Sequence, residues 1–219
     1  MPEAHRPTTP PGRRERHKAD KRDRITAAAR ARFAAAGYHA TTTAQIAHDA
    51  DVGAGTVFQY AATKPELLLM AMNDEIAACL ATGTAAAAEQ PTREPAVMTF
   101  FAPLLELADA HEENFSVYVR EILFGPPGHH RQAALDLVDR SEVALRDILA
   151  RPGEHGPHDQ PRPDADLVNA ARALVFAVLL EISSTRLGRN PESTTADRLR
   201  AQLHLVVHGI IATAGGKPT

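Results

Sequence analysis

The stretch VGAGTVFQYAATKPELL, Val52 to Leu68, decides the fold. It holds almost no large side chain until Phe58 and Tyr60, and after a break it places Lys64 where a helix should begin. A cation at a helix N-terminus is unfavourable, because the helix dipole is positive there. A short, nearly bare helix that is followed by such a cation therefore indicates a partner outside the chain.

The residues before this stretch predict two helices. An apolar stripe that includes Phe33 predicts a first helix over residues 21–36. Gly37 suits the end of that helix, because glycine readily adopts a left-handed conformation. Thr42 and Gln45 have the spacing of a capping box, which predicts the start of a second helix.

Within the quoted stretch, a short third helix is predicted from about Ala54 to Tyr60. Thr63 and Glu66 repeat the capping-box spacing and predict a fourth helix. Two short helices joined by a tight turn and packed on a first helix form a helix-turn-helix unit. The third helix would enter a major groove of DNA, where small side chains let its backbone come close. Lys64 would then contact a phosphate.

At these residues the sequence resembles the TetR family of transcriptional regulators. The matching run is RDRITAAARARFAAAGYHATTTAQIAHDADVGAGTVFQYAATKPELL, Arg22 to Leu68, about a fifth of the chain. Asp51 stands where the family usually has glycine, and aspartate tolerates a left-handed conformation better than most residues. Phe58 replaces a common tyrosine, which removes one hydroxyl that could bind a phosphate. The resemblance implies a DNA-binding head, a helical body with an effector pocket, and a dimer.

Contacts to double-stranded DNA are assigned on this basis. Thr42 and Thr43 begin the second helix, where hydroxyl and backbone N–H groups can hold a phosphate, and simple helix capping is the alternative. The hydroxyl of Tyr60 is a phosphate donor, and a merely packed tyrosine is the alternative. Gln59 can pair with adenine. The predicted DNA-binding residues are Thr42, Thr43, Ala54, Gly55, Thr56, Gln59, Tyr60 and Lys64.

Helical periods continue to the end of the chain, so the predicted class is all-α. We expect a disordered basic arm over residues 1–20, a helix-turn-helix domain over 21–68 and an effector-binding and dimerisation domain over 69–215. The arm lacks hydrophobes and cannot bury a core. Its cations can lie along DNA phosphates, and a solvated tail is the alternative. Further helices are expected over residues 94–109, 112–124, 130–149, 165–187 and 195–214.

Charge is distributed unevenly along the chain. Residues 1–71 hold 11 Lys and Arg against 7 Asp and Glu, 11 − 7 = +4, whereas the whole chain has a net charge of −3. A basic head on an acidic body suggests that only the head meets a polyanion. The single Cys79 permits no internal disulfide, and no run of ~20 apolar residues predicts a membrane span. We expect a cytoplasmic protein.

The resemblance implies that the middle helices enclose a pocket for a small-molecule effector. Because few charges interrupt the inner stripes, an apolar or aromatic effector is expected, with polar contacts from Tyr118, Glu121 or Arg120. Plain core packing is the alternative for each wall residue. The candidate ligand-binding residues are Met70, Met98, Phe101, Leu104, Phe115, Tyr118 and Phe124.

The last two predicted helices carry long apolar stripes. The resemblance implies that they form a four-helix homodimer interface, whereas spacing alone is also compatible with core packing. A dimer would place two heads on successive major grooves of a palindromic operator. The candidate interface residues are Leu174, Val178, Ile182, Leu203, Val207 and Ile210.

Two other functions compete with a ligand-released repressor, which is itself favoured by family analogy. A metal-dependent enzyme could use His155 with His158, or His129 with His130, but neither pair has the spacing of a specific metal motif. We therefore predict no enzyme, no metal site and no cofactor. A helical protein-interaction module without DNA binding would not need Thr42, Tyr60 and Lys64 together.

Overall fold

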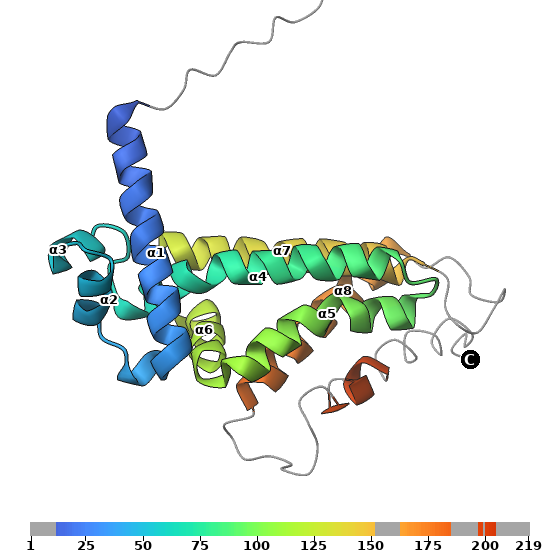
Figure 1. The fold of residues 1–219 in the computed structure, drawn as a ribbon. Coiled ribbons are helices and arrows are strands. Elements are labelled where there is room, and N and C mark those ends of the chain that lie inside the picture. Colours follow the sequence, from blue (N-terminus) through green and yellow to red (C-terminus); the bar gives the residue numbers. More distant parts are fainter. Residues whose placement is uncertain (1–11, 152–162, 185–196, 199, 205–219) are drawn as a thin grey trace, which may run out of the picture.

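The computed structural model describes residues 12–151, 163–184, 197–198 and 200–204. This described part is helical and contains no strand, which confirms the all-α class. A head formed by the first three helices lies at one end of a longer body (Figure 1). The helices are α1 (Arg13–Ala40), α2 (Thr43–Asp49), α3 (Ala54–Val57), α4 (Lys64–Ala88), α5 (Arg93–Ala110), α6 (Glu112–Phe124), α7 (His129–Leu149) and α8 (Asp164–Ser184).

Helix α1 begins well before the predicted position. The expected disorder up to residue 20 is wrong for residues 13–20, which are helical, while residues 1–11 lie outside the described part. Two local polar contacts support the extra turns. The backbone N–H of Gly12 donates to the Glu15 carboxylate at 3.2 Å, and Asp20 pairs with Arg24 one turn later at 3.5 Å.

The helical path breaks at Gly37, as the sequence predicts. Gly37 has φ +76°, a conformation that favours glycine, and α1 resumes beyond it only as far as Ala40. The Thr41 hydroxyl donates to the Gly37 carbonyl at 2.8 Å and fixes this corner. The corner directs the chain into α2.

The capping box of α2 is confirmed. The Thr42 hydroxyl accepts from the Gln45 backbone N–H at 3.2 Å, and the Gln45 side chain accepts from the Thr42 N–H at 2.8 Å. The turn after α2 contains Asp51 at φ +50°, so aspartate does take the left-handed position that glycine would occupy.

Helix α3 is shorter than predicted, because it ends at Val57 rather than at Tyr60. The next residues form tight turns: the Gln59 N–H donates to Thr56 and the Tyr60 N–H donates to Val57, at 3.1 and 2.9 Å. These i→i+3 bonds wind the chain more tightly than an α-helix. We call residues 54–60 the recognition segment.

Helix α4 connects the head to the body. The Thr63 hydroxyl accepts from the Glu66 N–H at 3.2 Å and caps its start, and the helix runs to Ala88, past the predicted end near Leu80. At Gly83 a Cβ atom would lie 2.0 Å from the carbonyl oxygen of Phe100 on α5. Glycine therefore allows the backbones of α4 and α5 to touch.

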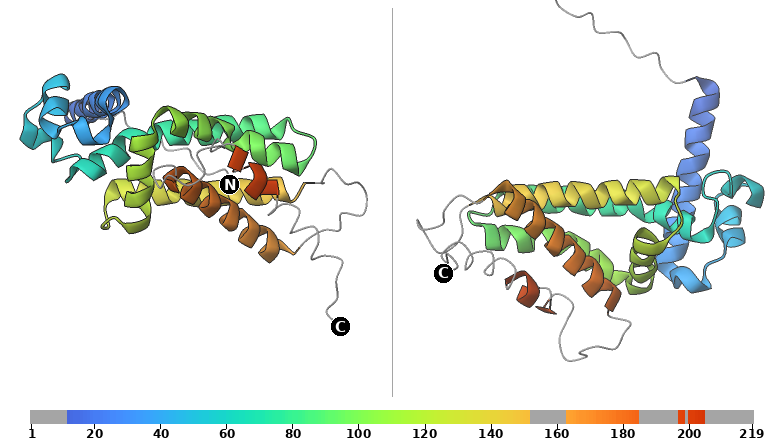
Figure 2. Two further views of the ribbon diagram at one scale, coloured as in Figure 1. Left: turned by 90° about the horizontal axis from the view of Figure 1, so that it is seen from below. Right: turned by 180° about the vertical axis from the view of Figure 1, so that it is seen from behind.

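Helices α4 and α7 lie side by side along the body, with α5 next to α4, and α6 reaches the end of α1 (Figures 1 and 2). Helix α8 packs against α6 and α7 on the far side of the view in Figure 1. Within the described residues, no helix is long and apolar enough to span a membrane.

Candidate DNA interface and ligand cavity

The predicted DNA-binding residues all remain accessible at the head. Ala54, Gly55 and Gln59 are exposed on the recognition segment, as is Thr42 at the start of α2. Val57 points inward instead and is 1% exposed. The recognition segment therefore has an apolar inner side, while its outer side carries the small residues Ala54 and Gly55 and, further along, the exposed Phe58 and Gln59. Thr43, Thr56, Tyr60 and Lys64 are half-buried.

Tyr60 has an intramolecular partner for its hydroxyl. This group donates to the backbone carbonyl of Lys18 on α1 at 3.1 Å. The contact favours the packed-tyrosine interpretation that the sequence left open, because it anchors the end of the recognition segment on α1. A phosphate contact from Tyr60 stays a prediction.

Lys64 is held in place by the head. Its Nζ lies 4.3 Å from the centroid of the Tyr38 ring and donates to the His39 carbonyl at 3.4 Å. Partial burial lowers the pKa of Lys64, and the Glu113 carboxylate acts in the opposite direction. An ammonium has three donors, so a phosphate can still bind to this fixed cation.

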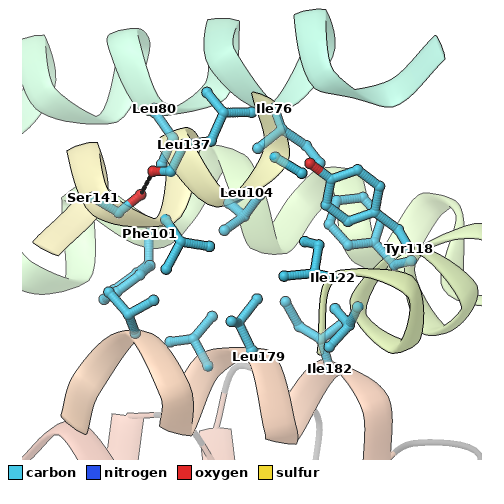
Figure 3. A pocket seen from close by; sticks show the side chains of 16 residues that line it. Ile76, Leu80, Phe101, Leu104, Tyr118, Ile122, Leu137, Ser141, Leu179 and Ile182 are labelled. Carbon is cyan, nitrogen blue, oxygen red and sulfur yellow. Dashed lines mark hydrogen bonds between the residues drawn. The ribbon is translucent and has the colours of Figure 1, made fainter. Parts of the chain in front are cut away.

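A cavity lies in the body between α4, α5, α6, α7 and α8 (Figure 3). Its lining is almost entirely apolar. The two polar side chains in its wall already have partners, since Tyr118 donates to Asn73 at 2.7 Å and Ser141 donates to the Leu137 carbonyl at 2.8 Å. Burial also raises the pKa of Tyr118, so this phenol stays neutral. The cavity favours an apolar ligand.

The cavity is small in this conformation, with a volume of about 40 Å³. Pockets for drug-sized ligands usually hold roughly 300–1,000 Å³. A ligand of that size must therefore separate the surrounding helices.

Four of the seven predicted ligand-binding residues, Phe101, Leu104, Phe115 and Tyr118, line this cavity. The other three do not. Phe124 is 81% exposed at the end of α6, Met98 packs beside the core, and Met70 lies near the junction of head and body. Arg120 and Glu121 pair with each other at 2.8 Å and do not line the cavity either.

Much of the cavity wall was not predicted from the sequence, because α4, α7 and α8 supply it. Sequence patterns alone could not select these positions, since periodicity shows which face of a helix is apolar but not which neighbour that face meets. They include Ile76, Leu80, Leu137, Ser141 and Val175.

A chain of hydrogen bonds connects the cavity to the recognition segment. Tyr118 in the cavity wall donates to the Asn73 side chain on α4, which in turn donates to the His130 carbonyl at 3.0 Å. The ring Nε2 of His130 lies 2.8 Å from the Tyr60 carbonyl oxygen. We call Tyr118, Asn73 and His130 the relay.

Helix α6 makes a second connection, to the corner at the end of α1. The Glu113 carboxylate accepts from the His39 N–H at 2.6 Å, and the buried Asn114 side chain donates to the Phe33 carbonyl at 2.8 Å. Helix α6 therefore contacts both the cavity and the head.

The predicted dimer residues of α8 lie inside the protomer. Leu174, Val178 and Ile182 are 0%, 1% and 3% exposed, and the latter two line the cavity. Leu203 is also buried, whereas Val207 and Ile210 lie outside the described residues. The most regular apolar stripe of α8 packs on the body, so these residues are not available to a partner subunit. The outer face carries Phe176 and Leu180, 39% and 59% exposed.

Only one of the two histidine pairs singled out by the sequence, His129 and His130, lies among the described residues. The rings of His129 and His130 contact each other, with centroids 5.0 Å apart. His155 and His158 lie outside the described residues. In the part of the chain that the structure describes, no three His, Cys, Asp or Glu side chains are grouped to hold a metal ion.

Comparison with known proteins agrees with the arrangement of the head. Residues 25–71 match the family model for bacterial regulatory proteins of the tetR family. No curated protein matches the chain.

Several solved structures share the whole fold. FadR of Thermus thermophilus, a TetR-family repressor in complex with lauroyl-CoA, is 22% identical with a TM-score of 0.68, over 90% of this chain and 99% of that chain. FadR of Bacillus subtilis, in complex with stearoyl-CoA, is 19% identical with a TM-score of 0.58, over 85% and 98%. A TetR transcriptional regulator from Rhodococcus sp. RHA1 is 18% identical with a TM-score of 0.62, over 87% and 97%. The predicted family resemblance is confirmed.

Proposed function

We propose that this chain, which has a TetR-family N-terminal domain and the fold of TetR-family regulators, is a ligand-responsive repressor. As a homodimer it would bind a palindromic operator in double-stranded DNA, and a small effector would release it. The observation that carries this proposal is the relay, because it joins a cavity wall to the recognition segment through three hydrogen bonds. A helical protein-interaction module would need no such connection.

The cavity and the comparisons together favour an effector with a long aliphatic chain. Isoleucine, leucine and valine side chains dominate the wall, and the two polar side chains in it are already hydrogen-bonded. Two of the similar structures hold lauroyl-CoA and stearoyl-CoA. We therefore propose a fatty acyl group, carried by coenzyme A, as the first effector to test.

The mechanism is a shift between two conformations. Because the cavity is nearly closed, an acyl chain binds best when α6 and α8 move away from α4. Tyr118 would move with α6, which strains its hydrogen bond to Asn73, while Glu113 displaces the corner of α1. The effector weakens DNA binding only to the extent that it prefers the open state. Repression follows if the operator overlaps a promoter, and a cytoplasmic location follows from this function.

The test begins with an operator selected from random duplexes by the purified protein. Lauroyl-CoA is then titrated into the protein–operator complex, and fluorescence anisotropy measures release. Coenzyme A alone and lauric acid are the controls that separate the nucleotide from the chain. Release by lauroyl-CoA supports the proposal. Failure to select any palindrome would contradict DNA binding, and an unchanged operator affinity with every acyl-CoA would contradict the effector class.

A further inference from the structure

The first turns of α1, residues 13–24, project beyond the hydrophobic core of the head (Figure 1). Residues 13–23 are exposed, and the core begins only at Ile25. An isolated helix of this length is marginally stable in water. We call residues 13–24 the extension. It buries no apolar side chain of its own, so core packing does not explain its helical conformation.

The charges of the extension oppose its own stability. It holds seven Lys and Arg and three Asp and Glu, 7 − 3 = +4. Arg13 and Arg14 occupy the first turn, where the helix dipole disfavours cations, and Glu15 is the one acid there. An anionic partner would offset this cost.

Three cations form a stripe on one face. Successive residues of an α-helix are about 100° apart, so Arg14, Lys18 and Lys21 lie within roughly 60° of one another, in line with Ile25. We call these three residues the cationic stripe. None of the three makes an ion pair among the described residues. The helix face that carries Ile25 is apolar and buried inside the head. In the extension, the same face carries three cations that make no ion pair among the described residues.

Two contacts turn this face toward the recognition segment. Before that segment, the Arg24 guanidinium pairs with Asp51 at 3.7 Å. After it, the Tyr60 hydroxyl donates to the Lys18 carbonyl at 3.1 Å. A groove between the extension and the recognition segment is lined by Lys18, Arg22 and Gln59, among others. Lys18 of the cationic stripe thus lies in the same groove as Gln59, a residue that is predicted to read a base.

We propose that the cationic stripe is a second DNA-contact surface, which binds backbone phosphates of the duplex beside each half-site. The inference rests on the proposed function and extends it. Twelve helical residues span about 18 Å, which corresponds to roughly five base pairs. The phosphates compensate the unfavourable cations at the helix start. The contact adds affinity without sequence preference.

Single substitutions test the stripe against a matched control. Lys18→Gln removes one cation of the stripe, whereas Arg16→Gln removes one cation from nearly the opposite face of the same helix. Glutamine, lysine and arginine have similar helix propensities, and the Lys18 carbonyl that holds Tyr60 remains. For each protein, the operator dissociation constant is measured over a range of salt concentrations. Lys18→Gln is expected to reduce the salt slope by about 0.9 for each phosphate that it no longer neutralises, and Arg16→Gln to leave the slope unchanged.

The length of the DNA supplies a second readout. Trimming about five flanking base pairs from each end of the operator should weaken binding by the unaltered protein. It should not weaken binding by the triple variant R14Q/K18Q/K21Q, which has no stripe to contact them. Equal sensitivity of the two proteins to trimming, or an unchanged salt slope for Lys18→Gln, would overturn the inference about the cationic stripe and leave the proposed function standing. Absence of any specific binding by the unaltered protein would overturn the proposed function as well.

Discussion

Individual residues decide how the head is built, and local chemistry made many of them predictable. Thr42 caps α2, Gly37 breaks α1 and Asp51 takes a left-handed turn position, because each depends only on its own backbone and near neighbours. The position of Lys64 at a helix start was predictable from the sequence. Its contact with the Tyr38 ring was not, because that contact joins distant parts of the chain. The Arg32–Asp49 pair between α1 and α2 was missed for the same reason.

Replacing Lys64 by alanine should weaken binding to all DNA sequences alike. The change removes a fixed cation that is predicted to bind a phosphate, so the salt slope should fall by about 0.9 for each phosphate that is no longer neutralised. Measurements on the operator and on an unrelated duplex check both effects. Lys64→Arg is the control, because it keeps the charge and should keep the slope. An unchanged operator affinity in Lys64→Ala would remove this lysine from the interface.

The Arg32–Asp49 pair predicts a pH dependence of stability. Hydrogen bonding to Arg32, joined by His48, lowers the pKa of Asp49 from 3.8 to about 2. A lowered folded-state pKa means that the pair stabilises the head above pH 3.8 and that this contribution is lost as the pH falls toward about 2. Asp49→Asn should therefore be less stable than the unaltered protein at neutral pH.

The difference between Asp49→Asn and the unaltered protein should shrink across the same acidic range, as followed by urea unfolding at a series of pH values. Asp139→Asn, at an exposed aspartate on α7, is the control and should track the unaltered protein throughout. A difference that stays constant with pH would show that Asp49 is not held in its charged form by this pair.

At the scale of elements, helix positions were predictable and helix lengths less so. The bounds of α6 are confirmed residue for residue, since a turn and the GPPG sequence flank it. Helix α3 is too short to show a helical period, and α4 passes its predicted end through a run of alanine, threonine and glycine. Tertiary contact explains the latter, because Gly83 lies against the α5 backbone.

Gly83→Ala should destabilise the body, although replacing glycine by alanine inside a helix usually increases stability. Alanine favours a helix over glycine by about 1 kcal/mol, so the helix alone would gain stability. The added Cβ would instead lie 2.0 Å from the Phe100 carbonyl oxygen and force α4 and α5 apart. A net loss of about 1–3 kcal/mol is expected from urea unfolding. Thr82→Ala, at an exposed neighbour on α4, should change stability by less than about 0.5 kcal/mol. A stabilised Gly83→Ala would mean that the helices do not touch there.

At the scale of the whole molecule, hydrogen bonds of α4, α6 and α7 connect the cavity with the head. Sequence patterns assigned these helices but could not predict the relay, since Tyr118, Asn73 and His130 meet only when three helices pack. The same limit explains the dimer residues. An apolar stripe on α8 fits a partner subunit and the protomer's own core equally well until its neighbours are known.

Breaking the relay should uncouple effector from operator. Asn73→Ala removes both of its hydrogen bonds, so the ratio of operator dissociation constants with and without lauroyl-CoA should fall toward one. Couplings of this kind are typically about 5- to 150-fold. Ser141→Ala is the control, because Ser141 lines the same cavity but bonds only within α7. If Asn73→Ala kept the full response, transmission would have to run through Glu113 and Asn114 instead.

We expect the proposed homodimer to form through the outer face of α8. Phe176 and Leu180 are exposed one turn apart on the side away from the cavity, where water would otherwise contact both side chains. Leu180→Glu would place a charge in a dimer interface without touching the protomer core, so the dimer should dissociate while each protomer stays folded. Sedimentation equilibrium measures the mass, and far-ultraviolet circular dichroism measures the helix content.

Val143→Glu, at an exposed apolar residue on α7, controls for added charge and should leave the mass unchanged. A dimeric Leu180→Glu would place the interface elsewhere, and a monomeric one should bind the palindrome more weakly, because each head would then bind its half-site alone.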